Sequence, residues 1–537
     1  MKKNGKGQVR CLLVRPEFLE DTFYNPRNLF RLLGGYSAAP PLGLLTVAAC
    51  LPPHWELKFV DGDIEPITDE HLAWANVLMI TAKGPQEIPM RRLCERARAR
   101  GIQVVVGGAG PTLQPERSLG MADYVVVGEA ENVMPRVVAD IENHSPKGLY
   151  RSEESVDLAK VPIPRWDLAK LDEYMFVGMN FTRGCPFSCE FCAQIEIFGR
   201  KPRVKPASRI LAEHQRLYDL GYRGMVDFGY DNLIGDIPRT EEVLRAMKGW
   251  NGEHGHPFCY STEATMNLAR LPRVLELMRD NDFRYVFMGI ESGDPDVLER
   301  AHKGQNTAMT PEQAVRILNQ HGMAVNTGLI IGFDGEDKHT ASNMLKMVQQ
   351  SGAFPTLVLP LHALPNTSLS RRLAREGRLF REGEIAKDDD DRTDTAATGL
   401  NFATQRPRAE VMSDLAHVLE HLYVPANHYA RLEHTLRQFE PAHKFRPPLK
   451  KALRMARSFK DVVRLVGLDR ETAPLFWKTL ARTLVTKPGA FEMVVGSAVM
   501  NANYHKQSKS YVRMLREQIS RVEQVGERAF NQSMGAS

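Results

Sequence analysis

Apolar and polar segments alternate regularly over residues 9–143. Continuous apolar strands separated by helices are typical of a parallel sheet covered on both faces. The pattern therefore predicts a doubly wound parallel sheet, a Rossmann-like α/β domain spanning residues 1–145, whose ligand lies beyond the carboxyl ends of the strands. The expected strands are Val9–Val14, Leu57–Val60, Val77–Thr81, Gln103–Val106 and Tyr124–Val127, and the expected helices are Pro41–Leu51, Asp69–Trp74, Ile88–Arg100 and Asn132–Glu142.

A second alternating region begins at Tyr174, after a polar, proline-containing stretch interpreted as a linker over residues 146–173. Six strand–helix units are too few for a closed barrel of eight, so we predict a partial (β/α)6 barrel over residues 174–385. Residues 386–537 are expected to be mostly helical. The barrel strands are expected at Phe176–Phe181, Met225–Phe228, Phe258–Ser261, Tyr285–Ile290, Val325–Ile331 and Thr356–Pro360.

Composition narrows the class of protein. Of the 537 residues, 43% are hydrophobic and 25% charged, as in globular chains. A net charge of only +5 argues against nucleic acid as the main partner. No apolar run approaches the roughly 18 residues of a membrane span. The basic N-terminus lacks a small-residue cleavage site and is interpreted as the start of the first strand. Seven cysteines make no disulfide framework, so a reduced, cytoplasmic chain is expected.

Three of the seven cysteines fall within eight residues, in the array Cys185-Pro-Phe-Ser-Cys189-Glu-Phe-Cys192. Three thiolates on one loop can hold three irons of a [4Fe–4S] cluster and leave the fourth iron open to another ligand. Structural zinc usually needs four protein ligands in paired arrangements, and the next cysteine, Cys259, is distant in the chain. The spacing therefore favours an iron–sulfur cluster. The remaining cysteines are expected to be buried small hydrophobes: Cys11, Cys50, Cys94 and Cys259.

This array, on a loop after the first strand of a six-unit barrel, resembles the radical S-adenosylmethionine (SAM) superfamily over about residues 174–370. In that superfamily the open iron binds SAM, and an electron from the cluster cleaves SAM to a 5′-deoxyadenosyl radical. Phe191 matches the usual aromatic before the third cysteine. The resemblance implies that strand ends contact SAM: Glu263 its amino-acid end, Glu291 and Ser292 its ribose, and Gly328 and Gly332 its adenine side.

The N-terminal domain resembles the cobalamin-binding domain fused to many of these enzymes. The resemblance is carried by Pro41–Leu44, by Gly107-Gly108 with Pro115-Glu116, and by Val127–Glu129, and tight turns are the alternative explanation of the glycines. It implies cobalamin contacts at Gly43, Gly107, Gly108, Gly128 and Glu129.

Cobalamin domains that place a histidine below the cobalt carry Asp-x-His-x-x-Gly after their first strand. Here Arg15-Pro16-Glu17 has no histidine, and Asp69-Glu70-His71 is followed by Trp74 where glycine is needed. We therefore expect cobalamin with no histidine below the metal.

The stretch from Asn366 to Leu379 resembles the subgroup that includes methylases of hopanoid lipids and of bacteriochlorophyll side chains. The resemblance implies a cobalamin-dependent radical SAM C-methyltransferase. Such an enzyme methylates an unactivated carbon of an apolar polycyclic or tetrapyrrole-like substrate through a 5′-deoxyadenosyl radical and methylcobalamin. The alternatives are ring contraction, cyclisation or rearrangement without net methyl transfer, a cluster-bearing redox sensor, and a methylthiotransferase. The pattern names no catalytic side chain for the substrate and no oligomeric state.

Two basic segments suggest macromolecular partners. Arg183, Arg200, Lys201 and Arg203 flank the cysteines. They are interpreted as a solvated or SAM-facing loop, with docking of a flavodoxin- or ferredoxin-type electron donor as the alternative. Residues 444–464 hold eight basic residues and one acid, with apolar residues on one helical face. Packing of that face on the barrel is the favoured interpretation, and peripheral contact with the inner face of the membrane is the alternative.

Overall fold

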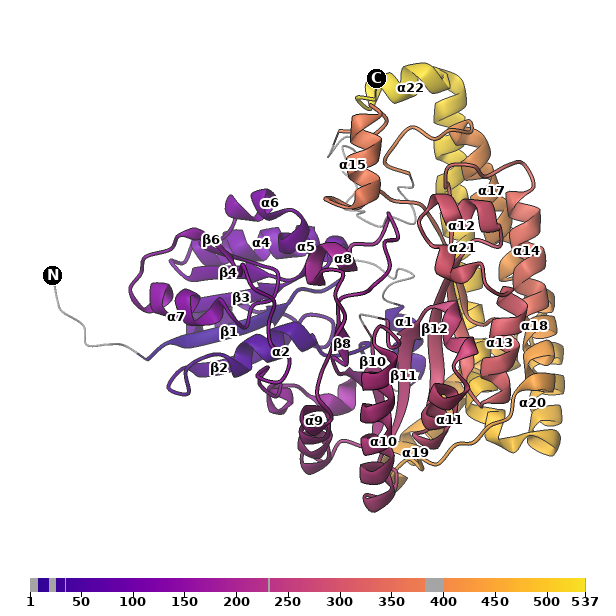
Figure 1. Ribbon diagram of the computed structural model, residues 1–537, viewed down its shortest axis with the longest axis horizontal. Helices are drawn as coiled ribbons and strands as arrows, with labels where there is room; N and C mark the ends of the chain where they lie inside the picture. Colours follow the sequence, from indigo (N-terminus) through magenta and orange to yellow (C-terminus); the bar gives the residue numbers. More distant parts are fainter. Residues whose placement is uncertain (1–7, 19–25, 34, 230–231, 382–399, 537) are drawn as a thin grey trace.

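The computed structural model describes residues 8–18, 26–33, 35–229, 232–381 and 400–536. Within these ranges the chain forms two six-stranded sheets followed by a group of helices. Figure 1 shows the first sheet with its helices at one side of the molecule, the second sheet in the centre, and the C-terminal helices along the other side.

The first sheet is parallel throughout and has the order β2-β1-β3-β4-β5-β6. Alternate residues of β1 enter different apolar clusters, with Leu12 and Val14 in one and Cys11 and Leu13 in the other, so helices cover both faces. The predicted doubly wound domain is confirmed. Its strands are β1 Arg10–Arg15, β2 Glu56–Asp61, β3 Val77–Thr81, β4 Gln103–Gly107, β5 Tyr124–Val127 and β6 Gly148–Arg151, and its main helices are α2 Leu42–Ala49, α3 Asp69–Trp74, α4 Glu87–Arg98, α5 Ala109–Leu113, α6 Pro115–Leu119 and α7 Met134–Glu142.

Strand β6 lies in the segment that we interpreted as a linker. Only Tyr150 of its four residues is buried, so the strand carries no apolar run that could identify it from sequence. It nevertheless pairs with β5 along its whole length. The first sheet therefore extends past residue 145.

The second sheet is also parallel, and its order, β14-β13-β12-β11-β10-β7, follows the chain. Sequential neighbours joined by helices form an open, partial barrel, as predicted. Its strands are β7 Phe176–Gly178, β10 Gly224–Phe228, β11 Phe258–Ala264, β12 Phe283–Glu291, β13 Ala324–Ile331 and β14 Thr356–Pro360. A short antiparallel pair, β8 Thr182–Arg183 and β9 Arg203–Val204, flanks the cysteine loop. The helices are α8 Gln194–Phe198, α9 Ala207–Asp219, α10 Ile237–Glu253, α11 Pro272–Asp280, α12 Pro295–Arg300, α13 Pro311–Gln320, α14 Thr340–Ser351 and α15 Ser368–Arg375.

The described residues after 400 are mostly helical, as expected. Helix α17 packs against α14, β14 and α21, while α18, α20 and α21 share an apolar cluster with Ala324 of β13. In the part of the chain that the structure describes, no helix combines the length and the hydropathy that crossing a bilayer requires. The helices are α17 Arg408–Leu422, α18 Pro425–Gln438, α19 Leu449–Val462, α20 Ala473–Thr486, α21 Phe491–Val525 and α22 Glu527–Ser533.

Helix α19 follows only in part the favoured interpretation that its apolar face packs on the barrel: Phe459 and Val466 join a cluster that includes Ala324 of β13. Among its described side chains only that of Val462 is buried. Leu449 and Leu453 are 75% and 51% exposed. Leu449, Leu453 and Ala456 of the predicted apolar face therefore remain at the surface, whereas Ala452, Phe459 and Val463 are half-buried and Val466 is buried.

A buried histidine joins α9 to the second sheet. The His214 ring nitrogens lie 2.8 Å from the carbonyl oxygen of Ile210 and 3.0 Å from the hydroxyl of Tyr260 on β11. Burial lowers the pKa of His214 to about 4. The folded protein therefore resists protonation at a site that takes up a proton readily when unfolded.

We expect His214 to make the folded state acid-sensitive. An unfolded histidine binds its proton near pH 6.5, and the folded one near pH 4. Between these values, each pH unit by which the pH falls therefore lowers the free energy of unfolding by about 1.4 kcal/mol. Thermal unfolding measured from pH 7 to pH 5 should show a larger drop in Tm for the wild type than for His214→Gln. Equal drops in the two proteins would show that His214 contributes nothing to this acid sensitivity.

Candidate functional site

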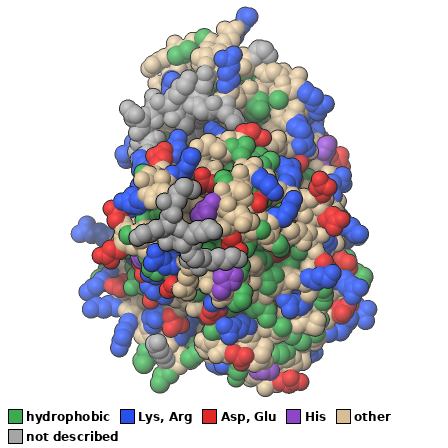
Figure 2. All heavy atoms as spheres, turned by 90° about the vertical axis from the view of Figure 1, so that its left-hand side faces the viewer, with side chains coloured by type: hydrophobic (Ala, Val, Ile, Leu, Met, Phe, Trp, Pro, Cys, Tyr) green, Lys and Arg blue, Asp and Glu red, His purple; other side chains and the backbone are tan. Residues whose placement is uncertain are grey.

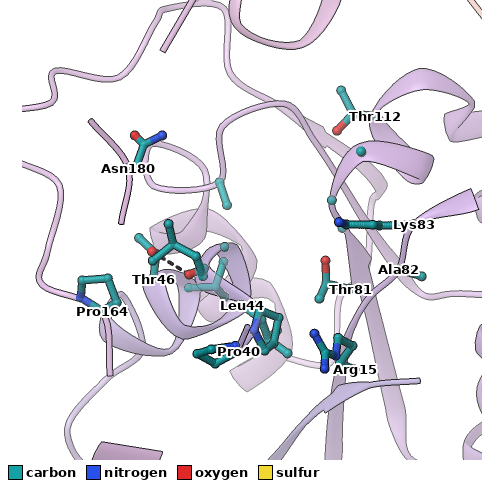
Figure 3. Close-up of a pocket in the computed structure, with 18 of the residues that line it drawn as sticks. Arg15, Pro40, Leu44, Thr46, Thr81, Ala82, Lys83, Thr112, Pro164 and Asn180 are labelled. Carbon is teal, nitrogen blue, oxygen red and sulfur yellow. Dashed lines mark hydrogen bonds between the residues drawn. The ribbon is translucent and has the colours of Figure 1, made fainter. Parts of the chain in front are cut away.

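A cavity of about 650 Å³ lies between the carboxyl ends of the two sheets. This is the size of a small-molecule site, and it lies where doubly wound sheets bind ligands. Figure 3 shows how side chains from the strand ends surround it. The first sheet and its loops contribute Arg15, Thr81, Lys83, Gly107, Gly108, Gly128 and Glu129, helix α2 contributes Gly43 and Leu44, and the barrel contributes Asn180, Arg183, Lys205, Asp227 and Glu263.

The five residues predicted to contact cobalamin all line this cavity: Gly43, Gly107, Gly108, Gly128 and Glu129. A Cβ added at Gly43 would meet no atom within 4 Å, so a larger side chain there would occupy cavity space. Gly108 has φ +105°, and a Cβ there would lie 2.6 Å from the Thr81 hydroxyl oxygen. Glycine at position 43 thus keeps the cavity wall open, and the backbone at position 108 requires glycine.

Two charged side chains reach the cavity from opposite domains. Lys83 follows β3, and Figure 3 shows its ammonium pointing into the cavity. Glu263 lies near the end of β11 and is exposed to the cavity. Burial among protein atoms, with Arg15 adding to it, lowers the pKa of Lys83, and Glu263 partly offsets both effects. A residue predicted to contact SAM therefore shares one cavity with the residues predicted to contact cobalamin.

Within the described chain, the cavity lining includes no histidine. His54 instead lies 3.1 Å from Glu142, and the His71 ring contacts Thr68 at the start of α3. Both of these histidines therefore lie outside the cavity lining.

Arg183 joins the two domains at the edge of the cavity. Its two terminal nitrogens each lie 2.6 Å from a carboxylate, one of Glu129 and one of Glu131. Arg203 also pairs with Glu129, at 2.9 Å. Burial would lower the pKa of Arg183, but Glu131 and Glu129 outweigh it and raise the value. Of the interpretation as a solvated or SAM-facing loop, the solvated part is wrong for Arg183 and Arg203, although Arg200 and Lys201 are exposed.

The three clustered cysteines lie on the loop between β8 and α8. Cys189 is buried, and Cys185 and Cys192 are half-buried. Gln305 donates a hydrogen bond from Nε2 to the Cys189 sulfur at 3.3 Å. Burial lowers the pKa of Lys303, but Glu291, Cys189 and Cys192 outweigh burial, so the pKa is raised and the ammonium keeps its charge. Burial raises the pKa of the Cys192 thiol, and Lys303 offsets this only in part. A cation and a hydrogen-bond donor beside the sulfurs fit an anionic cluster.

No group of three or more His, Cys, Asp or Glu side chains in the described residues is arranged to hold a metal ion. A [4Fe–4S] cluster poses a different requirement, because each cysteine binds its own iron atom and the three sulfurs need not converge on one point. Three thiols on one loop, with a neighbouring cation, fit that requirement.

The other residues predicted to contact SAM lie outside the lining of the cavity. Glu291 ends β12 and forms an ion pair of 2.6 Å with Lys303, on the side of the cysteines. Ser292 is buried, and its hydroxyl accepts a hydrogen bond from the Asp294 amide. Gly328 lies within β13, and the Gly332 amide donates to Glu336 at 2.9 Å.

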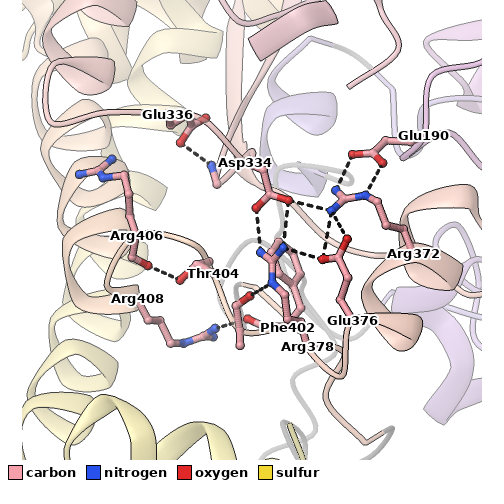
Figure 4. Close-up of polar contacts among 12 residues, drawn as sticks. Glu190, Asp334, Glu336, Arg372, Glu376, Arg378, Phe402, Thr404, Arg406 and Arg408 are labelled. Carbon is pink, nitrogen blue, oxygen red and sulfur yellow. Dashed lines mark hydrogen bonds and ion pairs between the residues drawn. The ribbon is translucent and has the colours of Figure 1, made fainter. Parts of the chain in front are cut away.

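An ion-pair network that sequence reasoning missed holds the cysteine loop from outside (Figure 4). Arg372 of α15 donates from Nε and Nη2 to the two oxygens of Glu190, each at 2.9 Å. Its third nitrogen lies 2.8 Å from Asp334, which also pairs with Arg378 at 2.7 Å. Because Glu190 stands between Cys189 and Phe191, α15 is tied directly to the loop. The one sequence signal for this network was Glu190, a charged residue inside the cysteine array.

Family models match three parts of the chain. The Radical SAM superfamily model matches residues 179–348, the B12 binding domain model matches residues 35–138, and a domain of unknown function matches residues 367–517. The first two matches contain the cysteine array and most of the glycine-lined cavity wall.

Known proteins resemble the chain over most of its length. An uncharacterized methyltransferase from Synechocystis sp. is 34% identical and covers 96% of both chains. The hopanoid C-2 methylase of Rhodopseudomonas palustris is 29% identical, over 90% of this chain and 91% of its own. The radical SAM methyltransferase TsrM from Kitasatospora setae, solved with cobalamin and a [4Fe–4S] cluster, shares the fold with a TM-score of 0.58 at 13% identity, over 85% of this chain and 100% of its own. With its cysteine loop, its glycine-lined cavity and these relatives, the chain belongs to the family of cobalamin-binding radical SAM methyltransferases.

Proposed function

We propose that the protein methylates an unactivated carbon of an apolar polycyclic substrate. The observation that carries the proposal is the single cavity whose wall combines Gly43, Gly108 and Gly128 of one domain with Glu263 of the other. SAM cleaved at the cluster supplies a 5′-deoxyadenosyl radical, and cobalamin supplies a transferable methyl group. A shared cavity would let one bound substrate meet both.

The chain's own residues hold and tune these groups. Cys185, Cys189 and Cys192 bind three irons of the cluster. Lys303 and Gln305 place a positive charge and a hydrogen bond at the sulfurs, which would make a bound cluster easier to reduce. In this proposal Glu263 binds the amino-acid end of SAM, and the segments that end β12 and β13 bind the rest: Glu291, Ser292, Gly328 and Gly332.

The cobalamin-binding wall works mainly by keeping space open. Gly43, Gly107, Gly108 and Gly128 let the macrocycle approach the backbone, and Glu129 orients the wall through its ion pairs with the barrel arginines. We propose that no histidine binds the metal from below. A flavodoxin- or ferredoxin-type donor would approach the exposed Arg200 and Lys201 beside the cysteine loop.

The substrate class rests on similarity to the hopanoid C-2 methylase, which favours a polycyclic lipid. A tetrapyrrole-like substrate is the second candidate, from the resemblance to bacteriochlorophyll methylases. Ring contraction, cyclisation or rearrangement would use the same two cofactors without net methyl transfer, and product analysis separates these reactions.

The first prediction concerns the cluster. Anaerobically purified protein should contain about four irons and four sulfides per chain. Alanine at Cys185, Cys189 or Cys192 should remove most of both, because each thiolate holds a separate iron. Cys259→Ala is the matched control, since Cys259 is buried in β11. Stoichiometric zinc without sulfide in the wild type would contradict the assignment.

The second prediction concerns cobalamin. Gly43→Leu should reduce cobalamin bound per chain at least tenfold while leaving iron content unchanged, because the new side chain enters the cavity. Gly249→Leu is a control on another helix, where an added Cβ also meets nothing within 4 Å. Bound cobalamin is measured by absorbance and by paramagnetic resonance of its cob(II) form.

The same spectra test the lower ligand. Without a histidine below the metal, the signal should lack nitrogen superhyperfine splitting. Nitrogen splitting that disappears in His54→Ala or His71→Ala would overturn this part of the proposal. For the preceding prediction, full cobalamin binding by Gly43→Leu would show that cobalamin binds outside this cavity.

The third prediction concerns the reaction. Each methylated product should be accompanied by one S-adenosylhomocysteine and one 5′-deoxyadenosine, because one SAM donates the methyl group and another generates the radical. Label from methyl-labelled SAM should appear in the product, which is measured by mass spectrometry with polycyclic lipids as first substrates. If 5′-deoxyadenosine forms with a turned-over substrate but no label enters the product, methyl transfer is refuted and rearrangement is supported.

A further inference from the structure

Exposed apolar side chains are concentrated in one segment of the chain. Of the thirteen exposed large hydrophobic residues among those the structure describes, nine fall between residues 449 and 491. They are Leu449, Leu453, Met455, Leu465, Leu468, Trp477, Leu484, Val485 and Phe491. Scattered exposed apolar residues are normal at a protein surface, but a concentration of this kind marks an interaction site.

These residues belong to elements that pack on one another. Helix α19 ends in a π-helical turn at Val463–Gly467, and Trp477 of α20 donates its indole hydrogen to the Gly467 carbonyl at 2.9 Å. The ring of Phe459 on α19 lies 6.1 Å from that of Phe491, at the start of α21. The exposed residues are therefore parts of one continuous piece of structure.

Each of the two helices leaves an apolar stripe uncovered. On α19, Leu449 and Leu453 are one turn apart and exposed. On α20, Phe476 and Leu480 are buried, whereas Trp477, Leu484 and Val485 fall on a neighbouring face and are 42%, 51% and 84% exposed. Burial of one face thus anchors α20 and leaves a second apolar face outward.

The same segment is strongly basic. Residues 444–491, which we call the basic apolar segment, hold twelve lysines and arginines against three acidic residues, a net charge of +9 in a chain whose total is +5. The rest of the chain is therefore slightly acidic. Figure 2 shows the face at the left of Figure 1, over which acidic and basic side chains are interspersed.

We propose that the basic apolar segment docks the protein on the surface of a bilayer that contains anionic phospholipid. Aliphatic and indole side chains enter the boundary between headgroups and acyl chains, and the exposed basic side chains, among them Arg457, Lys460 and Lys478, face the lipid phosphates. Nucleic acid would use the positive charge but gives exposed leucines no partner. A second copy of the chain docked through the same segment would place a net charge of +9 against another of +9, and the two segments would repel each other. The contact is peripheral, and it does not depend on which carbon the enzyme methylates.

The test uses the full-length holoenzyme and vesicles sedimented in 0.1 M and 0.5 M salt. One set of vesicles is phosphatidylcholine alone, and the other is an equal mixture with phosphatidylglycerol. Wild type should bind the anionic vesicles at least tenfold more tightly, and high salt should weaken this binding. Brominated lipid should quench Trp477 in the bound protein, and the quenched signal should be absent in Trp477→Phe.

Two variants remove the two components separately. Leu449→Gln with Leu453→Gln, and Arg457→Gln with Lys460→Gln, should each weaken vesicle binding roughly tenfold. Leu119→Gln with Leu149→Gln is the matched control, because these leucines are 43% and 42% exposed outside the segment. Its binding should equal that of the wild type. Iron content and Tm verify that each variant folds. If a variant does not fold, quenching of Trp477 in the wild-type protein tests the membrane contact without it.

Several outcomes would overturn the proposal. One is equal binding of wild type to the two kinds of vesicle, or no binding to either. Another is unchanged binding by the leucine variant. Dimerisation that the leucine variant abolishes, without vesicle binding, would assign the surface to a second copy. Tight binding to a DNA duplex, lost in the arginine–lysine variant and again without vesicle binding, would assign it to nucleic acid.

Discussion

The approach of two sheets through their carboxyl ends is the constraint on which the site depends, and the Arg183 guanidinium fixes that approach. It lies between Glu129 and Glu131, nearly excluded from solvent. A buried charge of this kind is tolerated only when every partner is in place. The two domains therefore cannot shift relative to each other without exposing the arginine or stranding a carboxylate, and the cavity between them keeps one width.

The cysteine loop is held by contacts from several distant parts of the chain. Arg183 lies at its start, Gln305 reaches the Cys189 sulfur, and Arg372 grips Glu190 inside the array. Lys303 couples the loop to Glu291 at the end of β12. The geometry of a short, irregular loop is in this way set by side chains from rigid elements, as a cluster site requires.

Much of the architecture could be read from the sequence because the inner strands of the first sheet are buried on both faces and form continuous apolar runs. In the second sheet, buried residues alternate with half-buried ones along most strands, and helical segments separate the strands. Strand β6 escaped prediction because only Tyr150 of it is buried. The cysteine spacing and the glycine-rich strand ends identified the chemistry. The roles of Lys303, Gln305 and Arg372 could not be foreseen, since they depend on chain segments more than a hundred residues away meeting in space. Arg183 and Arg203 were interpreted as part of a solvated or SAM-facing loop because their acidic partners lie in the other domain.

The bond between Arg372 and Glu190 bears on how such proteins can be recombined. The matched domain of unknown function begins at residue 367, so α15 belongs to it. Arg372 of α15 nevertheless forms a bidentate ion pair with Glu190 in the loop that carries the cysteines. A chimera joined at that boundary would set one protein's arginine against another protein's cysteine loop. The functional module is thus not contiguous in sequence, and an exchange of C-terminal regions among relatives would preserve the site only if Glu190 and Arg372 come from the same parent.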